Sequence, residues 1–148
     1  MPVANISIED RFAIYDLLGA YVWALDTGDV EGVVGVFTED AVSQDTRGNT
    51  FEGSDGIRAF ATKFISMPEF RGRQHYVEHL KIDEAEDGGY VVTSYWTVLQ
   101  WIFSHDVKKI VANGWSKDTC VKVGDEWRIK SRILEYWSDQ HGPWIGAG

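Results

Sequence analysis

The spacing of apolar residues in the first half of the chain predicts three helices, because apolar positions recur every three or four residues. The first is expected to begin after Ser7, a typical N-cap, and the second after Asp29, ending near 39–40. The third is expected to begin at Ser54 and to end before Pro68. The apolar positions of these helices are Ile14, Leu18, Tyr21 and Leu25, then Val33, Val34 and Phe37, then Ile57, Phe60, Ala61 and Phe64.

The pattern changes after Pro68, where long segments rich in Val, Ile, Tyr, Trp and Thr predict β-strands. Turn-forming residues at 87–89 and 124–125 separate these segments. A shorter strand is expected from Ala41, interrupted by a turn at 47–49. Helices followed by a run of antiparallel strands predict an α+β fold, in which a curved sheet wraps over the helices. The long predicted strands are 73–83, 89–104, 109–123 and 126–137.

The chain has 148 residues, a length typical of a single domain (1–148) with a substantial core. Residues 138–148 have the composition of a flexible tail, and Trp144 within it could close over a pocket. Aromatic residues make up 14% of the chain, which is more than a small core needs. Part of this aromatic surface is therefore expected to line a ligand pocket or a contact between subunits.

The net charge of -9 and the lack of a basic cluster argue against nucleic acid and anionic membranes as partners. Cys120 is the single cysteine, so the chain can form no internal disulfide and no multi-cysteine metal site. A lone cysteine fits a reducing compartment. The first ten residues lack the features of a secretion signal, so a cytoplasmic location is expected.

Five short motifs resemble the SnoaL-like branch of the nuclear-transport-factor-2-like (NTF2-like) superfamily, in order and in spacing. Together they extend over roughly 7–137. The resemblance implies a cone-shaped fold, with N-terminal helices packed in the concave face of a curved, mostly antiparallel sheet. The motifs are IEDRFAIYDL at 8–17, YVWALD at 21–26, FTEDA at 37–41, RQHYV at 73–77 and GDEWRI at 124–129.

Within this branch the pattern is most similar to scytalone dehydratase and its relatives, which include bile acid 7α-dehydratase and hexachlorocyclohexane dehydrochlorinase. In these enzymes an Asp at the end of the first helix supports a His at the start of a central strand. The matching residues are Asp26 and His75. The bile acid enzyme also has a Tyr five residues before its Asp, which corresponds to Tyr21.

The chain departs from scytalone dehydratase around this pair. That enzyme has a Tyr directly before its Asp, where this chain has Leu25. Its second inward His falls at Ile102 or a neighbour, and its Ser and Asn fall near Gly114 and Ser116. The resemblance therefore carries over the His–Asp pair but not the residues that select the substrate, and scytalone is not the expected substrate.

The His–Asp pair suits proton abstraction next to a carbonyl. Histidine titrates near neutral pH, and an adjacent carboxylate fixes its tautomer and stabilises the imidazolium. Each residue also has a purely structural explanation: His75 as a hydrogen-bonded core or surface histidine, and Asp26 as a turn acid in LDTGD. Tyr21 lies on the apolar helix face, about 140° from Asp26 on an ideal helix, so packing alone would explain it. Its other assignment is a hydrogen-bond donor to a substrate oxygen.

Further candidate residues for substrate binding come from the predicted strands. His79 shares the parity of His75, which predicts a second polar group in the pocket. A shared metal is not expected, because four residues of a strand span about 13 Å. Trp96 and Gln100 share one strand face and suit a flat aromatic ligand, although a core or interface Trp is an equal explanation. Asn113 and Arg132 are weaker candidates of the same kind.

The resemblance implies a lyase without a cofactor or metal, most simply a dehydratase acting on a hydrophobic or aromatic hydroxy-carbonyl compound. The same pair could serve dehydrohalogenation, loss of a small aldehyde, isomerisation or cyclisation. Two other classes remain open: a non-catalytic binding module, and a structural subunit like the small subunit of aromatic-ring dioxygenases. The resemblance also implies a homotrimer or homodimer that buries the outer sheet face.

Overall fold

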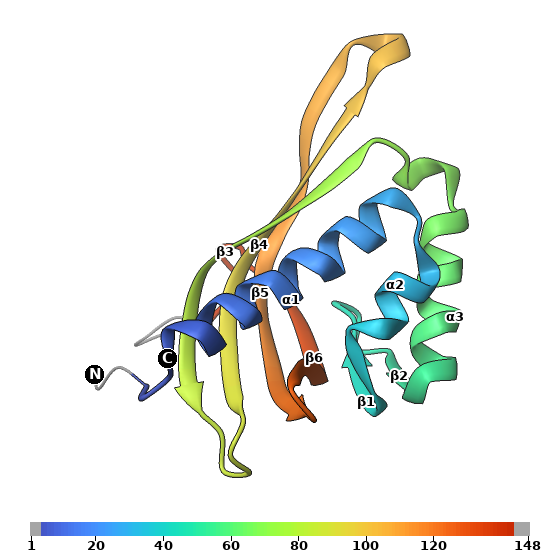
Figure 1. The fold of residues 1–148 in the computed structure, drawn as a ribbon. Coiled ribbons are helices and arrows are strands. Elements are labelled where there is room, and N and C mark those ends of the chain that lie inside the picture. The colour runs from blue at the N-terminus through green and yellow to red at the C-terminus, as the bar shows by residue number, and fades with distance from the viewer. Residues whose placement is uncertain (1–3, 144–148) are drawn as a thin grey trace.

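A computed structural model describes residues 4–143, and Trp144 of the predicted tail lies outside the described residues. The elements follow the predicted order of helices first and long strands afterwards (Figure 1). They are α1 (Ile8–Thr27), α2 (Val30–Gly35), β1 (Phe37–Gln44), β2 (Thr50–Glu52), α3 (Gly53–Ser66), the 3-10 turn η1 (Pro68–Phe70), β3 (Arg73–Glu84), β4 (Tyr90–Ile102), η2 (Phe103–His105), β5 (Val107–Val123) and β6 (Glu126–Tyr136).

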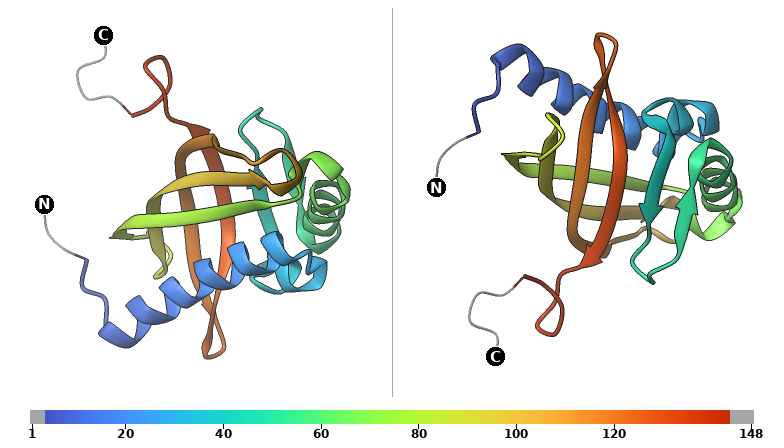
Figure 2. Two further views of the ribbon diagram at one scale, coloured as in Figure 1. Left: turned by 90° about the horizontal axis from the view of Figure 1, so that it is seen from above. Right: turned by 90° about the horizontal axis from the view of Figure 1, so that it is seen from below.

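The six strands form one sheet in the order β2-β1-β6-β5-β4-β3. Every neighbouring pair is antiparallel except β1 and β6, which run parallel. The sheet is strongly curved, and the helices cover one of its faces (Figures 1 and 2). The predicted α+β class, with helices against a curved and mostly antiparallel sheet, is confirmed.

The core forms where α1 lies across the inner face of the sheet. The predicted apolar face of α1 is buried, with Ile14 fully enclosed, and it meets inward residues of β4, β5 and β6 such as Val92, Cys120 and Ile129. On β4 the even-numbered residues from Val92 to Gln100 are buried, while Tyr95 and Trp101 of the alternate set are exposed. This alternation is the period-two pattern of a strand with one covered face.

The second predicted helix ends earlier than expected. The sequence prediction placed Phe37 within this helix and its end near 39–40, but α2 stops at Gly35 and Phe37 is the first residue of β1. The backbone N–H of Ile129 donates to the carbonyl of Val36 at 2.9 Å, which begins the parallel pairing with β6. Pairing within the sheet therefore overrides a local spacing that fits a helix equally well.

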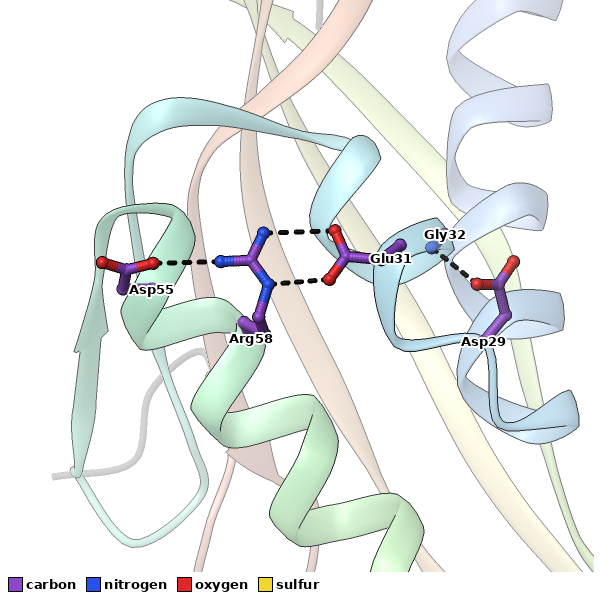
Figure 3. A network of polar contacts seen from close by, with 5 residues as sticks. All are labelled: Asp29, Glu31, Gly32, Asp55 and Arg58. Atoms are coloured by element: carbon purple, nitrogen blue, oxygen red, sulfur yellow. Dashed lines mark hydrogen bonds and ion pairs between the residues drawn. The ribbon is translucent and has the colours of Figure 1, made fainter.

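A polar network fixes α2 against α3 (Figure 3). Arg58 of α3 donates two hydrogen bonds to Glu31 of α2, at 2.7 and 3.1 Å, and a third to Asp55 at 3.0 Å. At the start of α2, the carboxylate of Asp29 accepts a hydrogen bond from the backbone N–H of Gly32 at 2.9 Å, as an N-cap does. These contacts hold the two helices together directly after the end of α1.

No helix among residues 4–143 is long and apolar enough to cross a membrane.

Candidate functional site

Asp26 and His75 are 49 residues apart in sequence and form a hydrogen-bonded pair in the fold. The Asp26 Oδ1 lies 2.6 Å from His75 Nδ1, and Oδ2 accepts the backbone N–H of His75 at 2.8 Å. Their side chains are 17% and 15% exposed. A carboxylate that holds both the ring and the backbone of one histidine sets the orientation of the imidazole and favours the tautomer with its proton on Nδ1. Nε2 is then the acceptor.

The end of α1 places Asp26 at this position. Gly28 takes the left-handed conformation (φ 83°), and its N–H reaches the carbonyl of Leu25, while Asp29 N–H donates to Ala24 at 2.8 Å. This pattern is a Schellman motif, which ends a helix and pairs two of the carbonyls left open at its C-terminus. The sequence TGD after Asp26 therefore ends the helix two residues after the last core residue, Leu25, and Asp26 faces His75 of β3.

The start of β3 is fixed equally tightly, which places His75. Gly72 has φ 78°, and a Cβ at this position would lie 2.7 Å from the carbonyl oxygen of Trp101. The side-chain amide of Gln100 donates to the carbonyls of Glu69 and Arg71, both at 2.8 Å. Gln100, predicted as a substrate-binding residue, thus uses both amide protons to hold the turn before β3.

A hollow of about 250 Å³ lies beside the pair, between the ends of α1 and α3 and the turn before β3. Its lining includes Asp26, Phe64 and Arg73. The Phe64 ring lies 5.8 Å from that of His75, and the Arg73 guanidinium lies over the Phe70 ring at 4.0 Å. The hollow is slightly smaller than the 300–1,000 Å³ common for ligand pockets, and it combines aromatic walls with one carboxylate and two cations, Arg71 and Arg73.

A second polar group lies deep inside the fold, under α1. Arg132 of β6 and Asp118 of β5 form an ion pair with Nε and Oδ1 at 3.2 Å, and their side chains are 2% and 0% exposed. The Arg132 guanidinium also lies 3.9 Å from the centre of the Tyr21 ring. Yet Arg132 Nε and Nη1 and Asp118 Oδ1 are buried without a hydrogen-bond partner among the described residues. A buried polar atom without a partner is costly, and it calls for an explanation such as an ordered water, an ion or a ligand.

Burial decides the direction of the pKa shift of two residues here, Tyr21 and Asp118. It raises the pKa of Tyr21, and the positive charge of Arg132 opposes the rise. Burial also raises the pKa of Asp118, again opposed by Arg132 and by a hydrogen bond from Ser116. Tyr21 therefore keeps its hydroxyl proton near neutral pH and is available as a hydrogen-bond donor.

Asp118 and Ser94 were not predicted as site residues, and Ser116 was named only as a position near which a residue of scytalone dehydratase falls. Ser94 and Ser116 hydrogen-bond each other at 3.0 Å, and Ser116 donates to Asp118 at 3.4 Å, all fully buried. The signal was a run of polar residues at alternate positions, 94 on one strand and 116 and 118 on the next, within strands whose inward positions are mostly apolar. Alternating polar positions on an inward face mark a polar cavity wall or a buried network.

The other predicted residues lie away from the pair. The parity argument for His79 is wrong, because β3 has a bulge between Glu78 and Lys81 and His79 itself has φ 57°. Its side chain is 71% exposed and stacks on Tyr95. A bulge adds one residue and reverses the face of the residues after it. His79 therefore contributes nothing to a shared pocket with His75.

Trp96 and Asn113 lie on opposite faces of the sheet. The Trp96 indole is buried against Gly114 and donates to the carbonyl of Trp115 at 2.9 Å. Asn113 is exposed and bonds the carbonyl of Trp137 at 3.2 Å. It lines a second hollow of about 310 Å³, whose other walls include Tyr95, Trp96 and Trp137. Trp96 is therefore buried towards the interior and also borders this hollow, whereas the side chain of Asn113 lies on the outer face.

Within residues 4–143, no three His, Cys, Asp or Glu side chains gather as metal ligands would. The single Cys120 is buried, and burial raises the pKa of its thiol to about 12, so it is not poised as a nucleophile.

The family assignment agrees with this arrangement. The SnoaL-like domain model matches residues 7–133, which is most of the chain. The chain belongs to the SnoaL-like domain family. No curated protein matches its sequence significantly.

Solved structures share the fold. Aln2 from a Streptomyces species has a TM-score of 0.79 at 22% identity, over 88% of this chain and 93% of that protein. ActVI-ORFA from Streptomyces coelicolor gives 0.76 at 24%, over 85% and 96%. A candidate scytalone dehydratase from Novosphingobium aromaticivorans gives 0.74 at 22%, over 95% and 96%. At such identities the likeness establishes the fold, and the resemblance found in the sequence motifs is confirmed at the level of the family.

Proposed function

We propose that this protein is a lyase that eliminates water from a hydrophobic or aromatic hydroxy-carbonyl compound by acid–base catalysis. The observation that carries the proposal is the double hydrogen bond of Asp26 to the ring and backbone of His75. A carboxylate that is hydrogen-bonded to a histidine in this way orients the imidazole to act as a general base. The similarity to a candidate scytalone dehydratase supports the same reaction class.

The proposed elimination needs only proton transfer. His75 Nε2 takes the proton from the carbon next to the carbonyl, and the electron pair left behind forms the carbon–carbon double bond. The hydroxyl on the neighbouring carbon departs with the proton that the imidazolium returns, so that water is the leaving group. Asp26 stabilises the imidazolium between the two transfers.

The carbonyl oxygen gains negative charge as the proton leaves, and it requires a donor. Arg132 Nε and Nη1 have no hydrogen-bond partner among the described residues, and Tyr21 keeps its hydroxyl proton. We assign to these two residues the binding of that oxygen, since donors in a buried site stabilise developing charge far better than in water. Trp96 supplies an apolar wall on the same inner face of the sheet.

The proton-abstraction step is testable before the natural substrate is known. An aromatic ketone such as 1-indanone exchanges its α-protons in D2O when a base acts on it, and NMR follows the exchange. We expect the protein to accelerate exchange, and His75→Asn to lose the acceleration. His79→Asn is the matched control, because it removes an exposed histidine of the same strand. Equal exchange by both variants would refute the assignment of His75 as the base.

A panel of aromatic β-hydroxy ketones then tests the leaving group, through the ultraviolet absorbance of the conjugated product. The competing class is a binding module. It predicts that ligands bind with similar affinity to the native protein and to His75→Asn, and that neither exchange nor elimination occurs.

A further inference from the structure

α1 carries a second apolar face that none of the described residues covers. Ile8, Phe12, Tyr15 and Trp23 are 69%, 65%, 47% and 72% exposed. Their spacings of four, three and eight residues place them on one side of the helix, away from the buried face that contains Ile14. A helix that is apolar on both sides is typical of one that is covered on both sides. The exposed fractions show that this face is accessible, and the N-terminal half of α1 lies at the periphery of the molecule in both views of Figure 2.

A glycine lies on the centre line of this face. A Cβ built at Gly19 meets nothing within 4 Å, so packing within residues 4–143 gives no reason for a glycine there. Glycine inside an exposed helix costs about 1 kcal/mol relative to Ala. Gly19 lies one helical turn from both Tyr15 and Trp23. A residue without a side chain at this place allows a second helix to approach closely.

Charged residues border the face on both sides, and their signs are opposite. On a helix that advances 100° per residue, Arg11 lies about 80° to one side of the centre line and Asp16 about 60° to the other. Neither forms an ion pair with another residue of the range 4–143. Both are therefore available to a partner that carries the complementary pattern.

A second copy of α1, packed in parallel across a two-fold axis, has that pattern. In such a pair the Arg11 edge of one helix meets the Asp16 edge of the other, five residues further along. Interhelical ion pairs of parallel coiled helices have this same offset. An antiparallel pair would instead bring the two Asp16 edges together, and like charges side by side are unfavourable. The parallel pair also places Gly19 opposite its own copy, where the helices come closest.

We propose that this face of α1 is a docking surface for the parallel α1 of a second copy of the chain. The four apolar side chains bury on the order of 500 Å² per copy, estimated from 150–250 Å² for each large aromatic residue. A standard stable interface buries about 800 Å² per partner. The dimer is therefore expected to dissociate on dilution more readily than one with a standard interface. It leaves the outer sheet face free.

Two glycine variants test the close approach. Gly19→Gln adds a side chain at the contact, and Gly35→Gln makes the same change in α2, where a Cβ also meets nothing within 4 Å. Both variants gain helix propensity, so both are expected to keep or raise the melting temperature. Sedimentation equilibrium is expected to show a dimer constant weakened about tenfold or more in Gly19→Gln and unchanged in Gly35→Gln. Equal association of both variants would overturn the proposed packing.

Charge exchange tests the direction of the two helices. Arg11→Glu places acidic residues on both edges and is expected to weaken the dimer, more at low salt than at high salt. The double variant Arg11→Glu/Asp16→Arg exchanges the two signs and is expected to restore association in the parallel pair. Failure of the double variant to recover any affinity lost by Arg11→Glu would overturn the parallel alignment.

Cross-linking tests the register and the competing surface. Cys120 is buried, so single engineered cysteines give a clean readout under mild oxidation. Ile8→Cys lies beside its own copy only in the parallel pair, and it is expected to form a covalent dimer. Ala20→Cys, exposed on another side of α1, is expected to form no covalent dimer. Tyr95→Cys reports on the outer sheet face. The absence of an Ile8→Cys dimer, with or without one at Tyr95→Cys, would refute the proposal.

Discussion

The buried ion pair of Asp118 and Arg132 gives the sharpest quantitative prediction. Neither side chain reaches solvent, and three of their polar atoms have no hydrogen-bond partner among residues 4–143. Removing one partner leaves the other charge buried and uncompensated, which costs about 3–5 kcal/mol. We expect Arg132→Met and Asp118→Val each to lose about this much free energy of unfolding.

The double variant distinguishes stability from function. Replacing a buried ion pair by apolar residues is often neutral, or stabilising by about 1–4 kcal/mol. We expect Asp118→Val/Arg132→Met to unfold at a urea concentration equal to or higher than that of the native protein. A fold that keeps a pair it does not need for stability keeps it for another purpose, such as the oxygen binding proposed for Arg132.

The penalty of Arg132→Met depends on pH with a definite sign. Burial already raises the pKa of Asp118, and without Arg132 its main opposing charge is lost. A carboxyl whose folded-state pKa exceeds its unfolded value of about 3.9 destabilises the fold increasingly as the pH rises above that value. The loss in Arg132→Met is therefore smaller at about pH 4 than at pH 7. If the double variant loses the sum of the two single losses at both pH values, the two charges do not interact and the argument fails.

The backbone of the site and the lone thiol give two further predictions. Gly72→Ala is expected to lower the free energy of unfolding by more than the roughly 1–2 kcal/mol that a left-handed alanine costs, and to impair catalysis by shifting β3. The control is Gly48→Ala, because Gly48 has φ 83° and no nearby atom, so this variant measures the backbone strain without a clash. Similar losses in the two variants by urea unfolding would contradict the clash with Trp101. Cys120 is expected to resist thiol reagents at about pH 8.5 until urea unfolds the chain. Rapid labelling of Cys120 in the native protein would contradict its burial. Because the folded-state pKa of the thiol is about 12, the free energy of unfolding also declines as the pH rises above the unfolded-state pKa near 8.5.

Local sequence signals located the elements well, because they act over a few residues. Ser7 caps α1 as predicted, with its hydroxyl accepting the N–H of Asp10 at 3.0 Å. The apolar period of α1 identified its buried face, and the glycines at 88 and 124 lie in the predicted turns between long strands. These features depend on backbone geometry and side-chain spacing, which the sequence contains directly.

Contacts between residues that are distant in sequence could be predicted from the sequence only in part. The resemblance named Asp26 and His75, but only the tertiary structure brings a carboxylate from the end of α1 to the ring and the backbone of one residue on β3. The Asp118–Arg132 pair depends on the register of β5 against β6, and no local rule sets that register. A contact between distant segments is fixed by pairing and packing of the whole sheet.

The sequence by itself determined the class of fold, the order of its elements and the face of α1 that enters the core. The tertiary structure decided where a strand departs from its period, as the bulge that turns His79 outward shows. It also decided that Phe37 pairs as a strand residue and that Gln100 serves the backbone before β3. The physical reason is that periodicity reports local geometry, whereas a bulge, a strand pairing or a buried charge is settled by the balance of hydrogen bonds and burial over the entire domain.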